Sequence, residues 1–337
     1  MTEDKIKKIQ TLVADASSIV IIQADNPDAD SLGSALALEQ ILSEAGKTVH
    51  LYCGVMIPQY LHHLDGWSRV SDRIPSKFDL SIIVDTSASS LLQKLSDSGQ
   101  QGWVSSKPCI VLDHHAETEN DITYATVVHN DPGVSSTGEL IYHLAKSLSW
   151  PLDVASGESI MSAILGDTQG LTNDLARSNT YTVMAELVDL GVSRPKLEEL
   201  RREYSKMDGR IFRYKARLIE RTELLADGKL AVVTVPQEEI NSYSPLYNPA
   251  PLIQSDMLQT IGVGIAIVLK SYDDGKVLAS IRCNQHTPIA SDLATRMGGG
   301  GHRYAAGFKI QDGRPFNEIK SECISIATEL LQTLDKD

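Results

Sequence analysis

Four short segments of this chain are each followed within three residues by an acidic residue, and this repeated pattern constrains the fold more than any other feature. Short apolar runs of this kind are typical of buried strands in parallel sheets. The carboxyl ends of such strands share one edge, where functional side chains gather. The pattern therefore predicts an open α/β sheet with a functional edge. The segments are Ile19–Ile22 before Asp25–Asp30, Ser81–Val84 before Asp85, Cys109–Leu112 before Asp113-His114-His115, and Ser162–Gly166 before Asp167.

The expected edge would collect several carboxylates and two imidazoles. Buried like charges repel strongly, so such a cluster is costly unless cations neutralise it. A divalent metal site is the simplest physical answer, and the donor set suits Mn²⁺, Mg²⁺, Co²⁺ or Fe²⁺. A single aspartate after a strand is more often a helix N-cap. The prediction therefore depends on the cluster and not on any one residue.

Composition limits the classes of partner. The 31 basic and 44 acidic residues give a net charge of −13, which disfavours a basic groove for long duplex nucleic acid. A short phosphoester remains compatible, because metals and a few local cations can hold a phosphate. No apolar stretch approaches the roughly 20 residues of a membrane span, so no membrane partner is expected. The charged N-terminus and four scattered cysteines indicate a cytoplasmic protein.

The order of patterns predicts two domains. Strand-like and helical patterns alternate over residues 1–192, which predicts a mainly parallel sheet with helices on both faces. Residues 193–226 are rich in Arg, Lys and Glu and are interpreted as a helical linker. Residues 227–337 contain strand-like runs at 230–235, 262–269 and 277–282 and a closing helical pattern at 316–334. They predict a smaller α/β domain.

Five motifs, in order along nearly the whole chain, resemble those of the DHH phosphoesterases. The small two-domain nanoRNase and pAp phosphatase group is the most similar branch. The first four motifs would form a catalytic domain, and the glycine-rich fifth would belong to the DHH-associated domain. The motifs are Asp28-x-Asp30-x-x-Gly33-Ser34, Asp85, Asp113-His114-His115, Asp167-Thr168, and Gly298-Gly299-Gly300-Gly301-His302 with Ala305-Ala306-Gly307.

The resemblance implies two Mn²⁺ ions, with Mg²⁺ or Co²⁺ as alternatives, and a water activated to attack phosphorus. In this scheme Asp85 bridges the two ions and Asp28 helps to hold one of them. The second ion would have three further ligands: Asp30, His114 and Asp167.

The resemblance also implies two roles beside the metals. His115 would contact the substrate phosphate, as an acid or as a stabiliser of charge. Asp113 would orient an imidazole.

One position departs from this branch. Its members usually carry a histidine four positions before the first aspartate of the first motif, where this chain has Ala24. Asp25 could supply a replacement oxygen, or the first metal could be held more weakly. Alternatively, Asp25 is an ordinary solvated loop residue.

The glycine-rich segment is expected to bind substrate. Its backbone, at Gly299, Gly300 and Gly301, can approach a ligand closely, and His302 supplies a directed donor. Arg282 ends a predicted strand, and its planar guanidinium suits a terminal phosphate. A flexible loop and a surface arginine are the plain alternatives.

The favoured function is a cytoplasmic, metal-dependent phosphoesterase. It would hydrolyse short oligonucleotides, linear dinucleotides or 3′,5′-bisphosphonucleotides such as pAp, in a cleft between the domains. A cyclic-dinucleotide phosphodiesterase would have the same motifs and is one alternative. A nucleotide-binding protein with weakened catalysis, indicated by Ala24, is another. The family resemblance also implies a homodimer.

Overall fold

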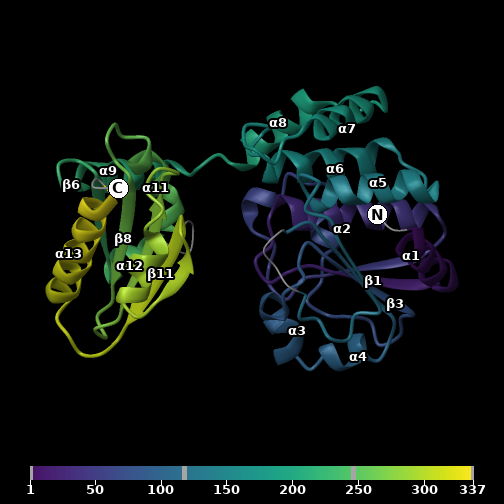
Figure 1. Ribbon diagram of the computed structural model, residues 1–337, viewed down its shortest axis with the longest axis horizontal. Coiled ribbons are helices and arrows are strands. Elements are labelled where there is room, and N and C mark those ends of the chain that lie inside the picture. Colours follow the sequence, from purple (N-terminus) through teal and green to yellow (C-terminus); the bar gives the residue numbers. More distant parts are fainter. Residues whose placement is uncertain (1–2, 116–119, 244–247, 335–337) are drawn as a thin grey trace. The chain divides into compact units, whose positions relative to one another are not determined.

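A computed structural model describes residues 3–115, 120–243 and 248–334. The chain divides into two compact units, Met1–Lys206 (unit 1) and Met207–Asp337 (unit 2), which we describe separately (Figure 1). Within the described ranges, no helix combines the length and apolar character needed to cross a bilayer.

Unit 1 is built on a five-stranded, fully parallel sheet in the order β2-β1-β3-β4-β5. The predicted mainly parallel sheet is confirmed. The strand register brings the carboxyl ends of β1, β3 and β4 to one edge, with Ile22 beside Ile83 and Val84 beside Leu112. The strands are β1 (Ser18–Ile22), β2 (Thr48–Tyr52), β3 (Leu80–Val84), β4 (Cys109–Asp113) and β5 (Val127–Asn130).

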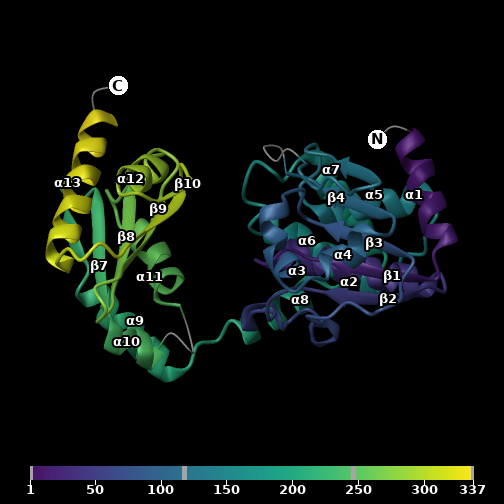
Figure 2. The same ribbon diagram turned by 90° about the horizontal axis from the view of Figure 1, so that it is seen from below.

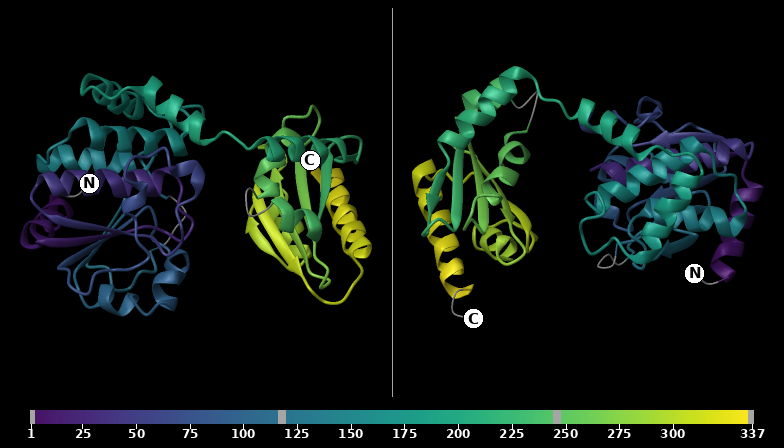
Figure 3. Two further views of the ribbon diagram at one scale, coloured as in Figure 1. Left: turned by 180° about the vertical axis from the view of Figure 1, so that it is seen from behind. Right: turned by 90° about the horizontal axis from the view of Figure 1, so that it is seen from above.

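Helices cover both faces of this sheet, as expected (Figure 3). Side chains alternate across a strand, so Ile19 and Ile21 pack toward α1, α2, α5 and α6, while Val20 and Ile22 pack toward α3 and α4. Helices α7 and α8 pack against α6. The helices are α1 (Glu3–Asp15), α2 (Ala29–Glu44), α3 (Gln93–Asp97), α4 (Gln101–Ser105), α5 (Thr137–Leu148), α6 (Val154–Asp167), α7 (Ser178–Asp189) and α8 (Arg194–Tyr204), with 3₁₀ turns η1 (Gln59–Leu61), η2 (Trp67–Arg69) and η3 (Ser89–Leu92).

Unit 2 contains a six-stranded sheet in the order β10-β11-β9-β8-β7-β6, in which only β7 and β8 pair in parallel. Helices α12 and α13 pack on one face, and α9 and α11 pack on the other (Figure 2). A smaller C-terminal α/β unit is therefore confirmed. Its elements are α9 (Gly209–Glu220), β6 (Glu223–Leu225), β7 (Leu230–Pro236), α10 (Gln237–Tyr243), α11 (Pro249–Leu258), β8 (Ile265–Ser271), β9 (Val277–Cys283), α12 (Ala290–Arg296), β10 (Gly300–His302), β11 (Ala305–Ile310) and α13 (Phe316–Leu334).

Two sequence expectations take a different form in the structure. The charged segment 193–226 contains two helices, α8 and α9, which belong to different units. The segment Ser162–Gly166 is not a strand but the last turns of α6, and it brings Asp167 to the sheet edge from the helical layer.

Candidate metal centre and phosphate-binding groove

The candidate metal ligands come from two strand ends and two helix ends in unit 1. Asp85 follows β3, and His114 follows β4. Asp30 lies in the first turn of α2, and Asp167 is the last residue of α6. The parallel sheet and the helices above it therefore deliver these four side chains to one edge.

Small residues let α2 and α6 pack closely enough to join their two aspartates. A Cβ placed on Gly33 would lie 2.7 Å from the Ser159 carbonyl oxygen, and one placed on Gly166 would lie 2.7 Å from the Ala29 Cβ. Larger side chains at either position would force the helices apart, because neither a carbonyl oxygen nor the Cβ of an alanine can move without its backbone. The glycines thus have a structural role in assembling the site.

His114 is at the centre of the cluster. Its Nε2 lies 3.0 Å from Asp167 Oδ2, 3.5 Å from Asp30 Oδ2 and 3.6 Å from Asp85 Oδ1. Two groups of donors have their ligand atoms within 4.8 Å of one another: Asp30, His114 and Asp167, and Asp85, His114 and His115. Two adjoining groups of oxygen and imidazole donors suit divalent cations that prefer such ligands.

Backbone and hydroxyl donors hold Asp30 in place. Its two oxygens accept hydrogen bonds from the backbone N–H groups of Thr137 (2.7 Å) and Gly138 (2.9 Å) and from Ser34 Oγ (3.0 Å). Thr137 begins α5, whose N-cap is Ser136, so the positive end of a helix dipole faces this carboxylate. Asp30 is fully buried and has little freedom to turn away.

Asp85 has an unusual backbone. Its φ is +62°, in the left-handed region that non-glycine residues seldom adopt. The Thr137 Oγ1 donates to Asp85 Oδ1 at 3.0 Å, and the Asp85 N–H donates to the Leu112 carbonyl at 2.9 Å. Backbone strain of this kind concentrates at functional sites.

The carboxylates destabilise one another. Burial and, next, the charge of Asp30 raise the pKa of Asp85 well above its ordinary value. Burial and the charge of Asp167 raise the pKa of Asp30. Burial lowers the pKa of His114, but its contacts with Asp167 and Asp30 outweigh burial, so the pKa is raised. Such groups fit a bound divalent cation, which would neutralise their charge.

Asp113 and His115 form a pair beside this cluster. Asp113 is buried, and its Oδ1 accepts from His115 Nδ1 at 2.7 Å while its Oδ2 accepts from Ser87 Oγ at 2.6 Å. Burial opposes ionisation of Asp113, but the bonds from His115 and Ser87 outweigh it and lower its pKa. The His115 side chain is 48% exposed. The geometry supports Asp113 as an orienting group for a half-exposed imidazole.

Two other predicted ligands, Asp28 and Asp25, have bonds that define local structure. Asp28 is the N-cap of α2, where its Oδ1 accepts from the Ser31 N–H at 2.9 Å. Asp25 Oδ2 accepts from the Lys94 N–H in the first turn of α3, at 2.7 Å. Neither belongs to the two donor groups found among the described residues. Ala24 is buried beside the Cys53 thiol, which donates to its carbonyl.

Unit 2 contains a groove of about 570 Å³ that is lined by Arg282, Gly298 and Gly299. Gly300, Gly301 and His302 are not among the lining residues. Two lysines that the sequence analysis missed, Lys270 and Lys309, also line it.

The strand register explains why these lysines reach the groove. Lys270 and Lys309 both pair with Leu278 from opposite sides, so their side chains lie on one face. Arg282 is four residues from Leu278 on the same strand and therefore shares this face. Neither lysine lies in a predicted strand, because Lys270 directly follows the run 262–269 and no strand was predicted around Lys309; finding them required the pairing of strands. The groove thus presents three cations on one sheet face.

The glycine run is largely explained by strand packing. A Cβ on Gly299 would lie 2.2 Å from the Gly307 carbonyl oxygen, and one on Gly301 would lie 2.6 Å from the Ala306 Cα. Gly298 has a φ of +78° directly after the last turn of α12, the left-handed position where glycine is favoured. These three glycines therefore allow β10 to lie against β11.

Comparison with known proteins identifies two regions of the chain. Residues 18–166 match the "DHH family, N-terminal domain", and residues 249–329 match the "DHHA1 domain". The chain is 25% identical over 307 residues to an uncharacterized MG371 homolog of Mycoplasma pneumoniae, covering 87% of this chain and 86% of the relative. It is 26% identical over 307 residues to the bifunctional oligoribonuclease and PAP phosphatase NrnA of Thermus thermophilus, covering 90% and 87%.

Another relative is much longer. The cyclic-di-AMP phosphodiesterase GdpP of Geobacillus thermodenitrificans is 24% identical over 325 residues, and the match covers 90% of this chain but 46% of that protein. Among solved structures, an exopolyphosphatase-related protein from Bacteroides fragilis has a TM-score of 0.85 at 21% identity, covering 100% of this chain and 98% of that one. Exonuclease RecJ bound to manganese has a TM-score of 0.54 at 17% identity, covering 97% and 95%. These structures share the fold.

Proposed function

Because this chain belongs to the DHH family of phosphoesterases and carries a DHHA1 domain, we propose that it hydrolyses short nucleotide phosphoesters with two bound Mn²⁺ ions. The substrates are short oligonucleotides, linear dinucleotides or 3′,5′-bisphosphonucleotides such as pAp. The observation that carries the proposal is the contact of His114 with three aspartates at one sheet edge. That cluster needs a cation, and phosphoester hydrolysis uses one.

Different residues of the cluster would hold the two metal ions. Asp30, His114 and Asp167 would hold one ion, and Asp85 would be shared with a second ion near Asp28. Bound divalent ions supply an activated water and neutralise charge on the phosphate. Asp85 is suited to a shared role because its Oδ1 lies 3.6 Å from His114 Nε2 and because the charges of both Asp30 and Asp28 act on it.

His115 would act on the substrate and not on the metals. Asp113 holds its Nδ1 and the side chain is half-exposed, so its Nε2 would donate to a phosphate oxygen or to the leaving group. Asp113 also raises the pKa of His115 through this hydrogen bond, so the imidazole keeps its proton to a higher pH than it would without Asp113.

The groove in unit 2 supports a short, multiply charged substrate. Arg282, Lys270 and Lys309 line it, and guanidinium and ammonium groups bind phosphate through charge-assisted hydrogen bonds. In a chain with a net charge of −13, such local cations favour compact anions over long polymers. The NrnA relative, named for oligoribonuclease and PAP phosphatase activity, is consistent with this substrate class.

A cyclic-dinucleotide phosphodiesterase is the second candidate. Two cyclic-di-AMP phosphodiesterases, GdpP and PdeA, are each 24% identical to this chain, which spans 46% of their length. A binding protein with weakened catalysis is less well supported. That hypothesis rested on Ala24, which stands where a metal-ligating histidine is usual. The other ligand positions carry aspartate or histidine, and His114 contacts three of the carboxylates.

A small hydrolysis panel tests these functions. The full-length protein is incubated with Mn²⁺ and pAp, pApA, a linear dinucleotide series, cyclic di-AMP or polyphosphate, and products are separated by chromatography. We expect turnover of pAp and the linear dinucleotides, and none in EDTA or with Asp85→Asn. Fastest turnover of cyclic di-AMP would select the second candidate. Nucleotide binding without any turnover would identify a binding protein.

A further inference from the structure

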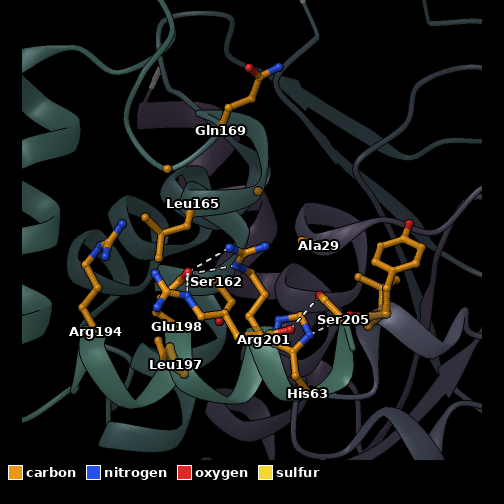
Figure 4. Close-up of a pocket in the computed structure, with 15 residues that line it drawn as sticks. Ala29, His63, Ser162, Leu165, Gln169, Arg194, Leu197, Glu198, Arg201 and Ser205 are labelled. Carbon is orange, nitrogen blue, oxygen red and sulfur yellow. Dashed lines mark hydrogen bonds and ion pairs between the residues drawn. The ribbon is translucent and has the colours of Figure 1, made fainter. Parts of the chain in front are cut away.

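Unit 1 has a pocket of about 530 Å³ that the proposed chemistry does not use (Figure 4). It lies where α8 packs against the C-terminal part of α6 and against η1. Three arginines of α8, Arg194, Arg201 and Arg202, line it, and Figure 4 labels two of them, Arg194 and Arg201, together with Glu198. This volume is within the usual range for a small-ligand site.

The three arginines outnumber the one acidic side chain, Glu198, that lines the pocket with them. Glu198 accepts from Arg201 Nε and Nη2 at 2.9 and 2.8 Å and from Arg202 Nε at 2.8 Å. Those bonds leave Arg201 Nη1 and both terminal nitrogens of Arg202 without a bond to Glu198. The Arg194 side chain has no hydrogen bond or ion pair with any described residue, although its backbone belongs to α8. Three guanidinium groups and one carboxylate give the pocket a local excess of two positive charges.

Glu198 also holds the side chains of Arg201 and Arg202 in position. Its hydrogen bonds from Arg201, above all, lower its pKa to about 2, so it is ionised throughout the physiological range. A permanently charged carboxylate that holds two arginine side chains limits the rotamer freedom that a ligand would otherwise have to remove. The free guanidinium donors are therefore partly preorganised for a planar or tetrahedral oxyanion.

The pocket floor is the backbone that carries the candidate metal ligands. Ala29 lies between Asp28 and Asp30, and Gly166 directly precedes Asp167; both line the pocket. Because Gly166 packs directly on Ala29, the floor and the ligands belong to one rigid contact between α2 and α6. An anion bound here would lie beside the metal centre within the same unit.

The wall after Asp167 has strained backbone. Gln169, Gly170 and Leu171 have φ values of +51°, +79° and +71°. Gln169 and Gly170 line the pocket, and two of the three residues are not glycine. Left-handed non-glycine residues persist where surrounding structure holds them, commonly at ligand sites.

We propose that this arginine pocket binds a phosphate-bearing anion and forms a second anion subsite of unit 1, distinct from the groove of unit 2. The phosphate has two conceivable sources: an additional phosphate group of the substrate, or a free phosphate compound. The first source rests on the proposed function, whereas the second does not. Guanidinium forks with unused N–H donors in a concave site are the groups that recognise phosphate.

Binding of inorganic tripolyphosphate to the metal-free full-length protein tests the site by isothermal titration calorimetry. Arg194→Ala combined with Arg202→Ala should weaken binding roughly tenfold for each arginine removed. Arg73→Ala is the matched control, an exposed arginine of unit 1 outside the pocket. All titrations are made in a background that carries Arg282→Ala, Lys270→Ala and Lys309→Ala, which removes the three cations of the unit 2 groove. Unchanged affinity in the double variant, or equal loss with Arg73→Ala, would overturn the proposal.

Kinetics then distinguish the two sources. If the substrate supplies the phosphate, the double variant should raise the KM for pAp more than that for adenosine 3′-monophosphate, with kcat little changed. If a free compound is bound, both KM values should stay constant while the effect of added tripolyphosphate on the rate is lost. Absence of all turnover by the wild-type protein would reject the proposed function, yet the calorimetric comparison would still decide the pocket.

Discussion

The two units hold their charged side chains in opposite ways. In unit 1, Asp30, Asp85 and His114 are buried and face one another across a few ångströms. In unit 2, Arg282 and Lys309 are exposed on an open sheet face. The acidic cluster contains strong repulsion that needs a cation, whereas the basic groove is solvated and stable without a ligand.

This difference predicts how the acidic cluster of unit 1 and the basic groove of unit 2 should respond to substitutions. A buried, mutually dependent cluster loses its function when one member is removed, because the remaining groups keep their desolvation cost. Exposed cations act more independently, so each substitution should give a partial and substrate-dependent loss. The following predictions order these effects from the largest to the smallest.

Asp85→Ala should have the largest effect. Asp85 belongs to one donor group and lies 3.6 Å from His114, which belongs to both. Its loss should therefore reduce Mn²⁺ affinity and turnover by on the order of 100-fold or more, beyond the 10–100-fold that supporting residues outside the metal shell provide. Calorimetry with Mn²⁺ and pAp hydrolysis measure the two losses. Wild-type turnover in this variant would remove the basis for a shared carboxylate.

Metal removal should destabilise unit 1 in a pH-dependent way. The folded protein raises the pKa of Asp85 and Asp30 above their unfolded values. Without metal, the protonated carboxyl groups therefore stabilise the folded state at pH values below their pKa in the unfolded chain, which is about 3.9 for aspartate. This stabilisation is lost as the pH rises through their raised pKa in the folded state. His114, whose pKa is also raised, contributes with the same sign.

We therefore expect EDTA to lower the melting temperature more at pH 8 than at pH 5, and Mn²⁺ to restore it. At 100 times its dissociation constant, Mn²⁺ should stabilise by about 2.7 kcal/mol. Differential scanning calorimetry provides the measurement, and Asp85→Asn is the control that should reduce the pH dependence. An effect of EDTA that is the same at both pH values would argue against a metal bound by these carboxylates.

Arg282→Ala should weaken the binding of substrates that carry a distal phosphate. The expected loss is about 1.5 kcal/mol, the contribution of one solvent-accessible charged hydrogen bond. A small chromogenic phosphoester should be cleaved at the wild-type rate, because it has no distal phosphate for Arg282 to bind. Steady-state KM and kcat for the two substrates test this, and Arg303→Ala serves as an exposed arginine outside the groove. Equal losses on both substrates would contradict the division between chemistry and binding.

Asp25→Ala should have the smallest functional effect. Its carboxylate accepts from the Lys94 N–H, so its removal should cost about 1 kcal/mol of stability, as for other helix caps. The Mn²⁺ concentration for half-maximal activity should not change. A shift in that titration would identify Asp25 as the ligand that replaces the histidine absent at Ala24.

Much of the architecture could be predicted because it depends on local pattern. Apolar runs predicted β1, β3 and β4, and the predicted strands 230–235 and 277–282 agree with β7 and β9 to within one residue. The closing helix was predicted with the bounds that the structure has. Period-two burial and helical periodicity are properties of neighbouring residues, so they can be read from the chain alone.

The sequence by itself determined which chemical groups follow the strands of unit 1: carboxylates and histidines, without thiolates. Only the tertiary structure decided which of them meet. Asp25 is bonded to a backbone N–H 69 residues away, and glycine contacts between α2 and α6 bring Asp30 toward Asp167. Strand register placed Lys270 and Lys309 on one face. Contacts of this kind depend on packing between distant segments, which local sequence patterns do not encode.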